Sequence, residues 1–370
     1  MPALGSKFAQ VNGLVAGQEA ALLAGQTFSD AVSSPLQAMA WGNTIRVNQD
    51  FSDRPQNEPT IAVNPSGRGR WVAGANDYAI GNPVGGGIYA RTGLPGAPAI
   101  YGYFPPFPLL YQSDTGIIEP PAGTGDPALV FSRTRASSPI PAGLPVVYYS
   151  TLGFSFSFCE NGVFVYRSLN DGLTWTRPVV PGLGGPLRTV VYQDKGLVCT
   201  VFHDKEWITA DNTGGPHNGR VYVTWTKFEF DGSGSYLRSP IMLSYSDDNG
   251  NTWSAPIEIS GSSADLCNFQ VSGPADECDE NQGSVPVVAA DGTVIVAFEN
   301  EQYAGAADGF RDQYLVVRVN PDTFAVSGPY GVALLYDGLN DYPFNSDGRQ
   351  TLCNSNFRVW SLGNIAIAPD

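Results

Sequence analysis

Short runs of apolar residues alternate with polar turns along most of the chain. One such unit is Thr60–Val63, a turn over residues 64–69, and then Trp71–Ala75. Runs of about four to eight residues rich in Val, Ile, Thr and aromatics, bounded by Gly, Pro, Asn and Asp, are typical of β-strands. The pattern therefore predicts an all-β chain built from hairpins.

This pair of strands recurs along the chain, and each copy begins after a polar residue. The predicted pairs are residues 60–63 with 71–75, 128–131 with 146–149, 207–210 with 221–225, and 285–289 with 294–298. Third strands are expected over residues 163–167, 241–245 and 314–319. The copies begin about 70–80 residues apart, which is the scale of a four-stranded propeller blade with generous loops.

The repeats divide the chain into expected regions. We expect a weakly ordered leader or linker over residues 1–40 and a propeller over residues 41–370, with a long insertion in the first repeat from Gly81 to Gly125. The expected blades cover approximately residues 50–123, 124–190, 200–262 and 280–335, and a partial fifth, residues 356–370, has its first strand at Asn364–Ala368. Because an open ring leaves unpaired strand edges, this favours a fragment of a six- or seven-bladed ring over four blades with extra strands.

Two segments share the form S-x-[DN]-x-G-x-T-W, Ser168–Trp175 and Ser246–Trp253. The Asn or Asp accepts backbone N–H bonds within a turn, the Gly supplies a positive φ, and the Trp carries a large apolar surface under the hairpin. The structural positions of the motif are Ser168, Asn170, Gly172, Trp175, Ser246, Asp248, Gly250 and Trp253. Turn chemistry alone explains all of these residues, so the motif indicates a fold better than a function.

The motif resembles the Asp box, or BNR repeat, of sialidases and related β-propellers, where it joins the third and fourth strands of a blade. Sialidases hold a carboxylate with three arginines and use a Tyr nucleophile, a polarising Glu and an Asp acid/base, which departs from the usual carboxylate pair. The resemblance implies that Asp77 and Glu299, at the ends of second strands, are catalytic. Asn57-Glu58-Pro59 stands where the family usually has Arg-Ile-Pro.

Antiparallel pairing puts the start of each first strand and the end of each second strand at one edge of a blade. Several polar residues should therefore meet on one face, opposite the Trp-ended turns. The expected binding residues are Glu58, Asp126, Asp204, Lys205, Glu206 and Arg358. The alternative is that these residues form the rim of a solvated channel.

Charge limits the classes of partner. The formal net charge is −15 and the pI is about 4.4, whereas nucleic acids and anionic membranes require basic surfaces. No apolar run approaches the roughly 18 residues needed to span a bilayer. We therefore expect no nucleic-acid partner and no membrane span.

Five cysteines suggest where the protein resides. Cys267 and Cys278 bracket a short loop and are a candidate disulfide, Cys159 with Cys199 is a second, and Cys353 is then left over. With the acidity of the chain, this favours an extracellular or cell-surface protein. Buried reduced thiols are the alternative.

No cofactor is required by any motif, but one acidic loop is a candidate Ca²⁺ site. Asp276, Glu277, Asp279 and Glu280 offer the hard oxygen ligands that this ion binds. They do not follow the spaced EF-hand pattern, and a solvated acidic loop is the alternative.

The sequence favours a secreted or surface sialidase-like propeller that binds, and in an enzymatic version hydrolyses, extracellular glycans. Clustered carboxylates and loops stapled by disulfides support this hypothesis. The rival is a non-catalytic propeller that acts as a scaffold or adhesion module, with a protein partner or further domains of a longer chain. The missing Arg motif and the incomplete fifth repeat favour the rival.

Overall fold

The computed structural model describes a large part of the chain beyond the first 55 residues. The described residues are 56–65, 70–77, 85–91, 100–104, 111–112, 118–119, 123–137, 139–154, 159–175, 190–194, 198–269, 274–303, 311–335 and 362–368. The predicted leader or linker, Arg358 and Cys353 lie outside them.

Four antiparallel sheets of four main strands follow one another along the chain. The first is β1 (Gln56–Val63), β2 (Trp71–Asp77), β3 (Gly85–Arg91) and β4 (Ile100–Phe104), and the second is β7 (Gly123–Arg133), β8 (Pro145–Phe154), β9 (Asn161–Ser168) and β10 (Val190–Asp194). The third is β11 (Val201–Ala210), β12 (Val221–Phe230), β14 (Ile241–Ser246) and β15 (Ile257–Glu258), and the fourth is β16 (Asn281–Val288), β17 (Val294–Tyr303), β18 (Arg311–Val319) and β19 (Val326–Leu334). The short strands β5 (Tyr111–Gln112) and β6 (Ile118–Glu119) pair with each other, and β13 (Tyr236–Arg238) pairs with β12.

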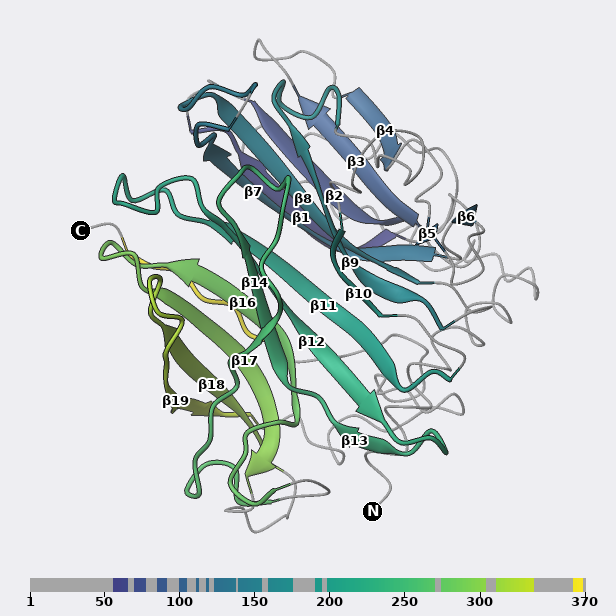
Figure 1. Ribbon diagram of the computed structural model, residues 1–370, viewed down its shortest axis with the longest axis vertical. Coiled ribbons are helices and arrows are strands. Elements are labelled where there is room, and N and C mark those ends of the chain that lie inside the picture. Colours follow the sequence, from purple (N-terminus) through teal and green to yellow (C-terminus); the bar gives the residue numbers. More distant parts are fainter. Residues whose placement is uncertain are drawn as a thin grey trace, which may run out of the picture.

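The sheets are arranged as blades around a common axis (Figure 1). The first strand of each blade is the inner one: β1 lies against β7, β7 against β11, and β11 against β16. Sequential four-stranded antiparallel blades that pack in this way define a β-propeller. The predicted all-β propeller is confirmed.

Two details of the prediction are wrong. Residues 81–125 are not simply an insertion, because β3 and β4 lie there and complete the first blade. Glycine-rich β3 lacks the apolar alternation by which a strand is detected, since Gly contributes no side chain to the pattern. Residues 364–368 form no strand: this segment has no ladder partner in the described part of the chain.

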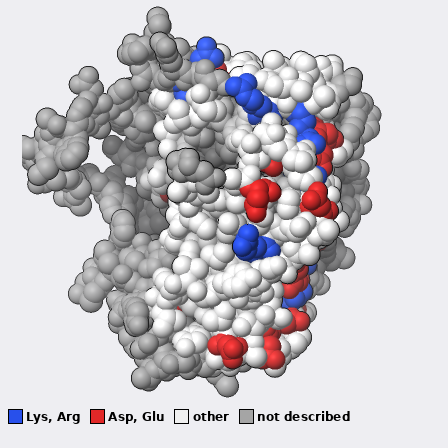
Figure 2. Space-filling model, turned by 90° about the vertical axis from the view of Figure 1, so that its left-hand side faces the viewer, with Lys and Arg blue, Asp and Glu red and all other residues white. Residues whose placement is uncertain are grey.

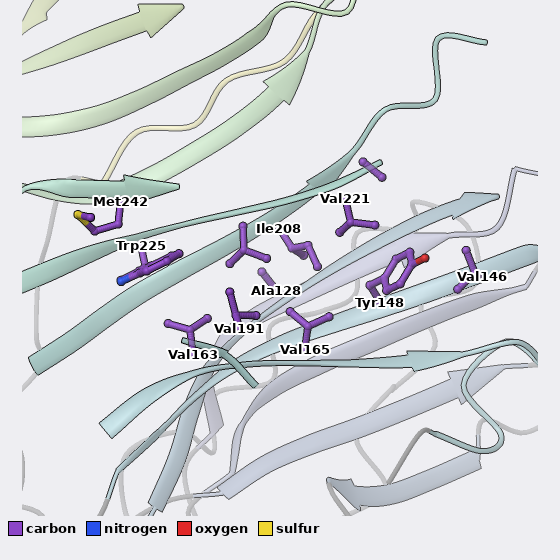
Figure 3. Close-up of a cluster of buried hydrophobic side chains, with 12 residues drawn as sticks. Ala128, Val146, Tyr148, Val163, Val165, Val191, Ile208, Val221, Trp225 and Met242 are labelled. Atoms are coloured by element: carbon purple, nitrogen blue, oxygen red, sulfur yellow. The ribbon is translucent and has the colours of Figure 1, made fainter. Parts of the chain in front are cut away.

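Apolar side chains fill the space between neighbouring blades. In the cluster of Figure 3, side chains from the second and third blades interdigitate, and Trp225 and Tyr148 are fully buried. Every residue of β9 is buried, because the second blade lies between the first and the third and both of its faces are covered. Burial of this kind contributes roughly 25 cal/mol for each Å² of apolar surface removed from water.

The two Trp-ended turns, Ser168–Trp175 and Ser246–Trp253, join the third and fourth strands of the second and third blades. In each, the Ser hydroxyl accepts the Gly N–H, the Asn or Asp side chain accepts the Thr N–H, and the Gly has positive φ. The bonds are Gly172 N to Ser168 Oγ (2.9 Å), Thr174 N to Asn170 Oδ1 (2.9 Å), Gly250 N to Ser246 Oγ (2.8 Å) and Thr252 N to Asp248 Oδ1 (2.8 Å).

These turns lie at the edge opposite the polar face. In the third blade, Val221 pairs with Ser246 at one end, whereas Thr226 pairs with Asp204 at the other. The predicted disulfides Cys159–Cys199 and Cys267–Cys278 are both formed, and each lies in loops of the polar face. The propeller therefore separates a face of turns from a face of disulfide-bonded loops.

Candidate functional site

A pocket of about 200 Å³ lies where the inner strands of all four blades converge. Its lining combines charged and apolar residues from each first strand and from the segment after residue 361. The lining residues are Glu58, Pro59, Asp126, Pro127, Lys205, Glu206, Trp207, Gly283, Ser284, Val285, Leu362 and Gly363.

A repeated backbone irregularity places these residues. Each inner strand has a register shift near its start, and the residue in the shift has positive φ: Glu58 at 52°, Asp126 at 52°, Lys205 at 52° and Gly283 at 66°. A β-bulge re-aims side chains that regular pairing would send to alternate faces. Four equivalent bulges thus direct the start of every blade towards one point.

Among the described residues that line the pocket, Lys205 is the cation, and it links three blades. Its Nζ lies 2.5 Å from Glu58 Oε2 and 3.2 Å from Asp126 Oδ2. All three side chains are at least partly buried, with exposed fractions of 14% for Lys205, 26% for Glu58 and 15% for Asp126. Ion pairs with so little solvent around them are less screened than surface pairs.

The two carboxyl groups beside Lys205 differ in charge. Burial, and next the negative charge of Asp126, raise the pKa of Glu58 to about 8. Burial alone would raise the pKa of Asp126 too, but the Lys205 charge and hydrogen bonds from Glu58, Asn76 and Lys205 together outweigh it and lower that pKa below its usual range. At neutral pH Asp126 is therefore ionised and Glu58 protonated. This is expected because the charge of one carboxylate makes ionisation of a neighbouring carboxyl unfavourable.

Glu206 is a third carboxyl group, and it is isolated. It is 2% exposed, and neither carboxylate oxygen has a hydrogen-bond partner on another residue. Burial, and next the charge of Asp126, raise the pKa of Glu206 well above the usual value. A buried polar group without a partner is rare in proteins and calls for an explanation. Here the group borders a pocket, and its burial favours the protonated form.

The opposite wall of the pocket is apolar. Gly283 takes the bulge position in the fourth blade. The side chain of Leu362 fills the space that a Cβ atom on Gly283 would occupy. Gly363 lies against the ring of Tyr314 in the same way. The pocket thus has a charged side from the first three blades and an apolar side from the fourth blade and residues 362–363.

Four of the predicted binding residues, Glu58, Asp126, Lys205 and Glu206, meet in this pocket. Asp204 lies next to it, buried, and its Oδ2 accepts a bond of 2.6 Å from Gln282 Nε2. The sixth, Arg358, is outside the described residues.

The predicted catalytic residues Asp77 and Glu299 do not line the pocket. Both are buried, and Asp77 Oδ2 accepts a bond of 2.9 Å from Gln56 Nε2. They end second strands, as expected, but their roles stay predictions.

The acidic loop does not assemble a cation site of three carboxylates. Asp276 and Glu277 are exposed or half-buried, whereas Asp279 and Glu280 are buried. Among the described residues, the acidic groups whose oxygens lie within 4.8 Å of one another are instead Glu299, Glu301 and Asp312. Ca²⁺ binding by the loop stays a prediction.

Sequence analysis missed the residues that shape the pocket. Trp207, Ser284, Val285, Leu362 and Gly363 were not among the expected site residues. For Trp207, Ser284 and Val285 the signal is their position, because they occupy or follow the bulge. The recurring Glu58-Pro59 and Asp126-Pro127 pairs mark that bulge in the first two repeats.

In the described part of the face shown in Figure 2, basic and acidic side chains are interspersed. No helix in the described part of the chain has the length and apolar character to cross a membrane.

Comparison with known proteins gives structural similarity only. No protein-family profile matches the sequence, and no curated protein is significantly similar to it. Similar solved structures include a GH93 α-L-arabinofuranosidase of Fusarium graminearum in complex with arabinobiose (10% identity, TM-score 0.47, 75% of this chain and 66% of that one). Others are an α-L-arabinanase of Penicillium chrysogenum in complex with arabinobiose (12%, 0.46, 80% and 68%) and a GH43 endo-arabinanase of Bacillus licheniformis (11%, 0.41, 77% and 81%).

The chain spans slightly less than two thirds of the Fusarium enzyme. By their names these enzymes are an arabinofuranosidase and two arabinanases, and none of the three is a sialidase.

Proposed function

We propose that this protein is a secreted or cell-surface β-propeller that binds a sugar residue in the axial pocket and hydrolyses its glycosidic bond. Glu206 would act as the proton donor and Asp126 as the base. The two disulfides support an oxidising, extracellular location. The sialidase-type roles of Asp77 and Glu299 are replaced in this proposal by residues that border the pocket.

The observation that carries the proposal is the isolated carboxyl of Glu206, with its raised pKa, beside the carboxylate of Asp126, with its lowered pKa. Most glycoside hydrolases use two carboxyl groups in different protonation states that flank the scissile bond. Environments that separate the pKa values of neighbouring acids are how proteins assign such roles. A purely structural explanation leaves the unpartnered Glu206 unaccounted for.

The reaction balances with these two groups and one water molecule. Glu206 gives its proton to the glycosidic oxygen as the bond from that oxygen to the anomeric carbon breaks. The water oxygen bonds to the anomeric carbon, and Asp126 takes the proton that the water loses. Acid–base catalysis of this kind contributes about 10²–10⁴-fold in rate.

The pocket also suits a sugar by size and polarity. Its volume of about 200 Å³ is below the roughly 300–1,000 Å³ of pockets that hold drug-sized ligands. Sugar rings present hydroxyls at their edges and apolar C–H groups on their faces, which matches a pocket with one charged and one apolar side. A single sugar unit is the ligand that we expect.

Hydrolysis of a panel of fluorogenic glycosides tests the proposal, with sialosides, hexosides and arabinosides all represented. We expect turnover of at least one member and a loss of about 10²–10⁴-fold in Glu206→Gln. Glu229→Gln is the matched control, because Glu229 pairs with Lys227 and Arg238 away from the pocket. Asp77→Asn and Glu299→Gln test the earlier assignment in the same assay.

Three outcomes would contradict the proposal. One is undiminished turnover in Glu206→Gln, and another is loss of turnover only in Asp77→Asn or Glu299→Gln. The third is the absence of turnover together with no sugar binding by calorimetry. Binding without turnover would leave the non-catalytic adhesion module as the function.

A further inference from the structure

The strand β11 departs from regular pairing where the pocket is formed. Asp204 pairs with Thr226, but the next pair is Trp207 with Thr224, so that Lys205 and Glu206 stand in the bulge. Lys205 has a φ of 52°, a conformation that L-residues other than Gly, Asn and Asp rarely adopt. Such strain persists only where the surroundings impose it and is common at functional sites.

The bulge brings two consecutive side chains into one pocket. In a regular strand, Lys205 and Glu206 would point to opposite faces. Here both line the pocket. The equivalent bulge in the fourth blade carries Gly283, which adopts positive φ without strain. Lysine is thus not needed for the backbone at this position, and its side chain requires another explanation.

The side chain of Lys205 holds the inner ends of the first three blades together. It starts in the third blade and reaches Glu58 in the first and Asp126 in the second. It is an ammonium group between one protonated and one ionised carboxyl. Removal of the ammonium would leave Asp126 next to Glu58, and no other cation is present among the described residues that line the pocket.

We infer that Lys205 is a positioning residue of the axial site, which orients the Asp126 carboxylate and keeps it ionised so that it can act as a base. The inference rests on the proposed function for the role of Asp126 as a base, but not for the effect of Lys205 on its charge.

The charged and polar groups around Asp126 come from three neighbouring strands. Glu58 faces it from β1, and Lys205 and Glu206 face it from β11, while Asn76 on β2 donates a hydrogen bond to its Oδ1. Lys205 is the cation of this set, so its effect on Asp126 is opposite in sign to that of the acidic groups. A nearby cation lowers the pKa of a carboxyl by about 1–3.

The test is a ¹³C NMR titration of carboxyl groups in the full chain, with the Asp126 signal assigned by its loss in Asp126→Asn. In Lys205→Gln we expect the pKa of Asp126 to rise by about 1–3, and in Lys205→Arg we expect the wild-type value. Lys205→Gly is a second variant, because glycine fits the positive φ and so removes the ammonium without backbone strain. Lys227→Gln is the control, since Lys227 pairs with Glu229 outside the pocket.

The pH dependence of turnover is then measured on a substrate from the glycoside panel. Its acid limb should move to higher pH in Lys205→Gln and Lys205→Gly, and it should lie at the wild-type pH in Lys205→Arg. An unchanged Asp126 titration in both neutral variants would overturn the inference. A shifted titration in a protein that hydrolyses no glycoside would uphold the effect of Lys205 and refute the proposed function alone. Loss of activity with no shift in either the titration or the rate profile would show a merely structural role.

Discussion

The amide side chain of Asn76 in the first blade forms two hydrogen bonds with Asp126 in the second. Asn76 Nδ2 donates to Asp126 Oδ1 at 3.0 Å, and Asn76 Oδ1 accepts from the Asp126 backbone N–H at 2.7 Å. Asn76 is 4% exposed, so water does not readily replace it. One side chain thus fixes both the bulge of β7 and the orientation of its carboxylate.

Replacement of Asn76 by Ala should loosen Asp126. We expect a loss of stability of about 1–3 kcal/mol from the buried polar groups left unpaired, and a fall in kcat of up to about 100-fold from misplacement of the base. Urea denaturation and turnover measure the two effects. Gln56→Ala is a control in the same blade, because it loses a bond to Asp77 instead. Equal effects from both variants would contradict a special role for Asn76.

The isolation of Glu206 predicts a gain in stability at the expense of activity. Glu206→Met has a similar volume and removes a buried polar group that has no partner, so we expect stabilisation by about 1–2 kcal/mol. Turnover should fall by about 10²–10⁴-fold. Denaturant midpoints and turnover rates, measured on the same preparations of wild type and variant, test both expectations. A destabilised variant would imply that Glu206 has a polar partner in solution.

Asp279 predicts a pH-dependent stability. Burial, and next the charge of Glu277, raise its pKa to about 6, and its Oδ2 has no hydrogen-bond partner. The folded chain therefore keeps a proton that the unfolded chain has lost between pH values of about 4 and 6. The stabilisation is fully present below that window and is lost as the pH rises through about 6.

Asp279→Asn should remove this dependence. At pH 7 we expect the variant to be more stable than the wild type by about 2 kcal/mol, and at pH 4 by much less. Glu258→Gln, a half-exposed carboxyl in an ion pair with Arg238, serves as the control. Parallel stability curves for Asp279→Asn and the wild type between pH 4 and 7 would contradict the prediction.

The fourth residue of each Trp-ended turn joins neighbouring blades. Asp171 Oδ1 accepts from Asn64 Nδ2 at 2.6 Å, and its Oδ2 accepts from Arg70 Nη1 at 2.8 Å. In the next blade, Asn249 Oδ1 accepts from the Arg135 N–H at 2.8 Å. Each turn is thereby fastened to the turn between the first two strands of the preceding blade.

Asp171→Gly tests this fastening, since glycine keeps the positive φ of 57° and removes only the side-chain bonds. We expect a cost of about 1–3 kcal/mol and a smaller cost in Asp171→Asn, which keeps one amide oxygen for the neighbouring blade. Leu173→Ala alters an exposed residue of the same turn and should cost little. A Leu173→Ala effect as large as that of Asp171→Gly would refute the prediction.

Gly283 and Leu362 predict the size limit of the pocket. A Cβ on Gly283 would collide with Leu362, and its φ of 66° disfavours any other residue. Gly283→Ala should therefore weaken sugar binding by pushing Leu362 into the pocket. The double variant with Leu362→Ala should recover part of the loss, and calorimetric titration measures this coupling. Additive effects in the double variant would show that the two residues act independently.

Part of the fold and of the site could be predicted because it depends on local chemistry. The turns at Gly172 and Gly250 follow from residues within one segment, and the strands that alternate or carry β-branched residues were found at their observed places. Antiparallel pairing then sufficed to group Glu58, Asp126, Lys205 and Glu206 on one face.

The errors arose where partners distant in the chain decide the outcome. Strand β3 is recognised only by its neighbours β2 and β4, because glycines give no pattern of their own. Residues 364–368 have an apolar sequence typical of a strand, but a strand requires a ladder partner. The catalytic roles of Asp77 and Glu299 stay predictions, since a position at a strand end does not specify whether a side chain reaches the pocket.

The amino-acid sequence alone determined the repeated strand pairs, their turns and the polar character of one face. These properties depend on periodicity and on neighbours in the chain. Only the tertiary structure decided that Lys205 lies between Glu58 and Asp126, that Glu206 lacks a partner, and that Leu362 closes the apolar side. The reason is that the bulges aim these side chains at a common axis, and both burial and charge at that axis depend on residues from four blades at once.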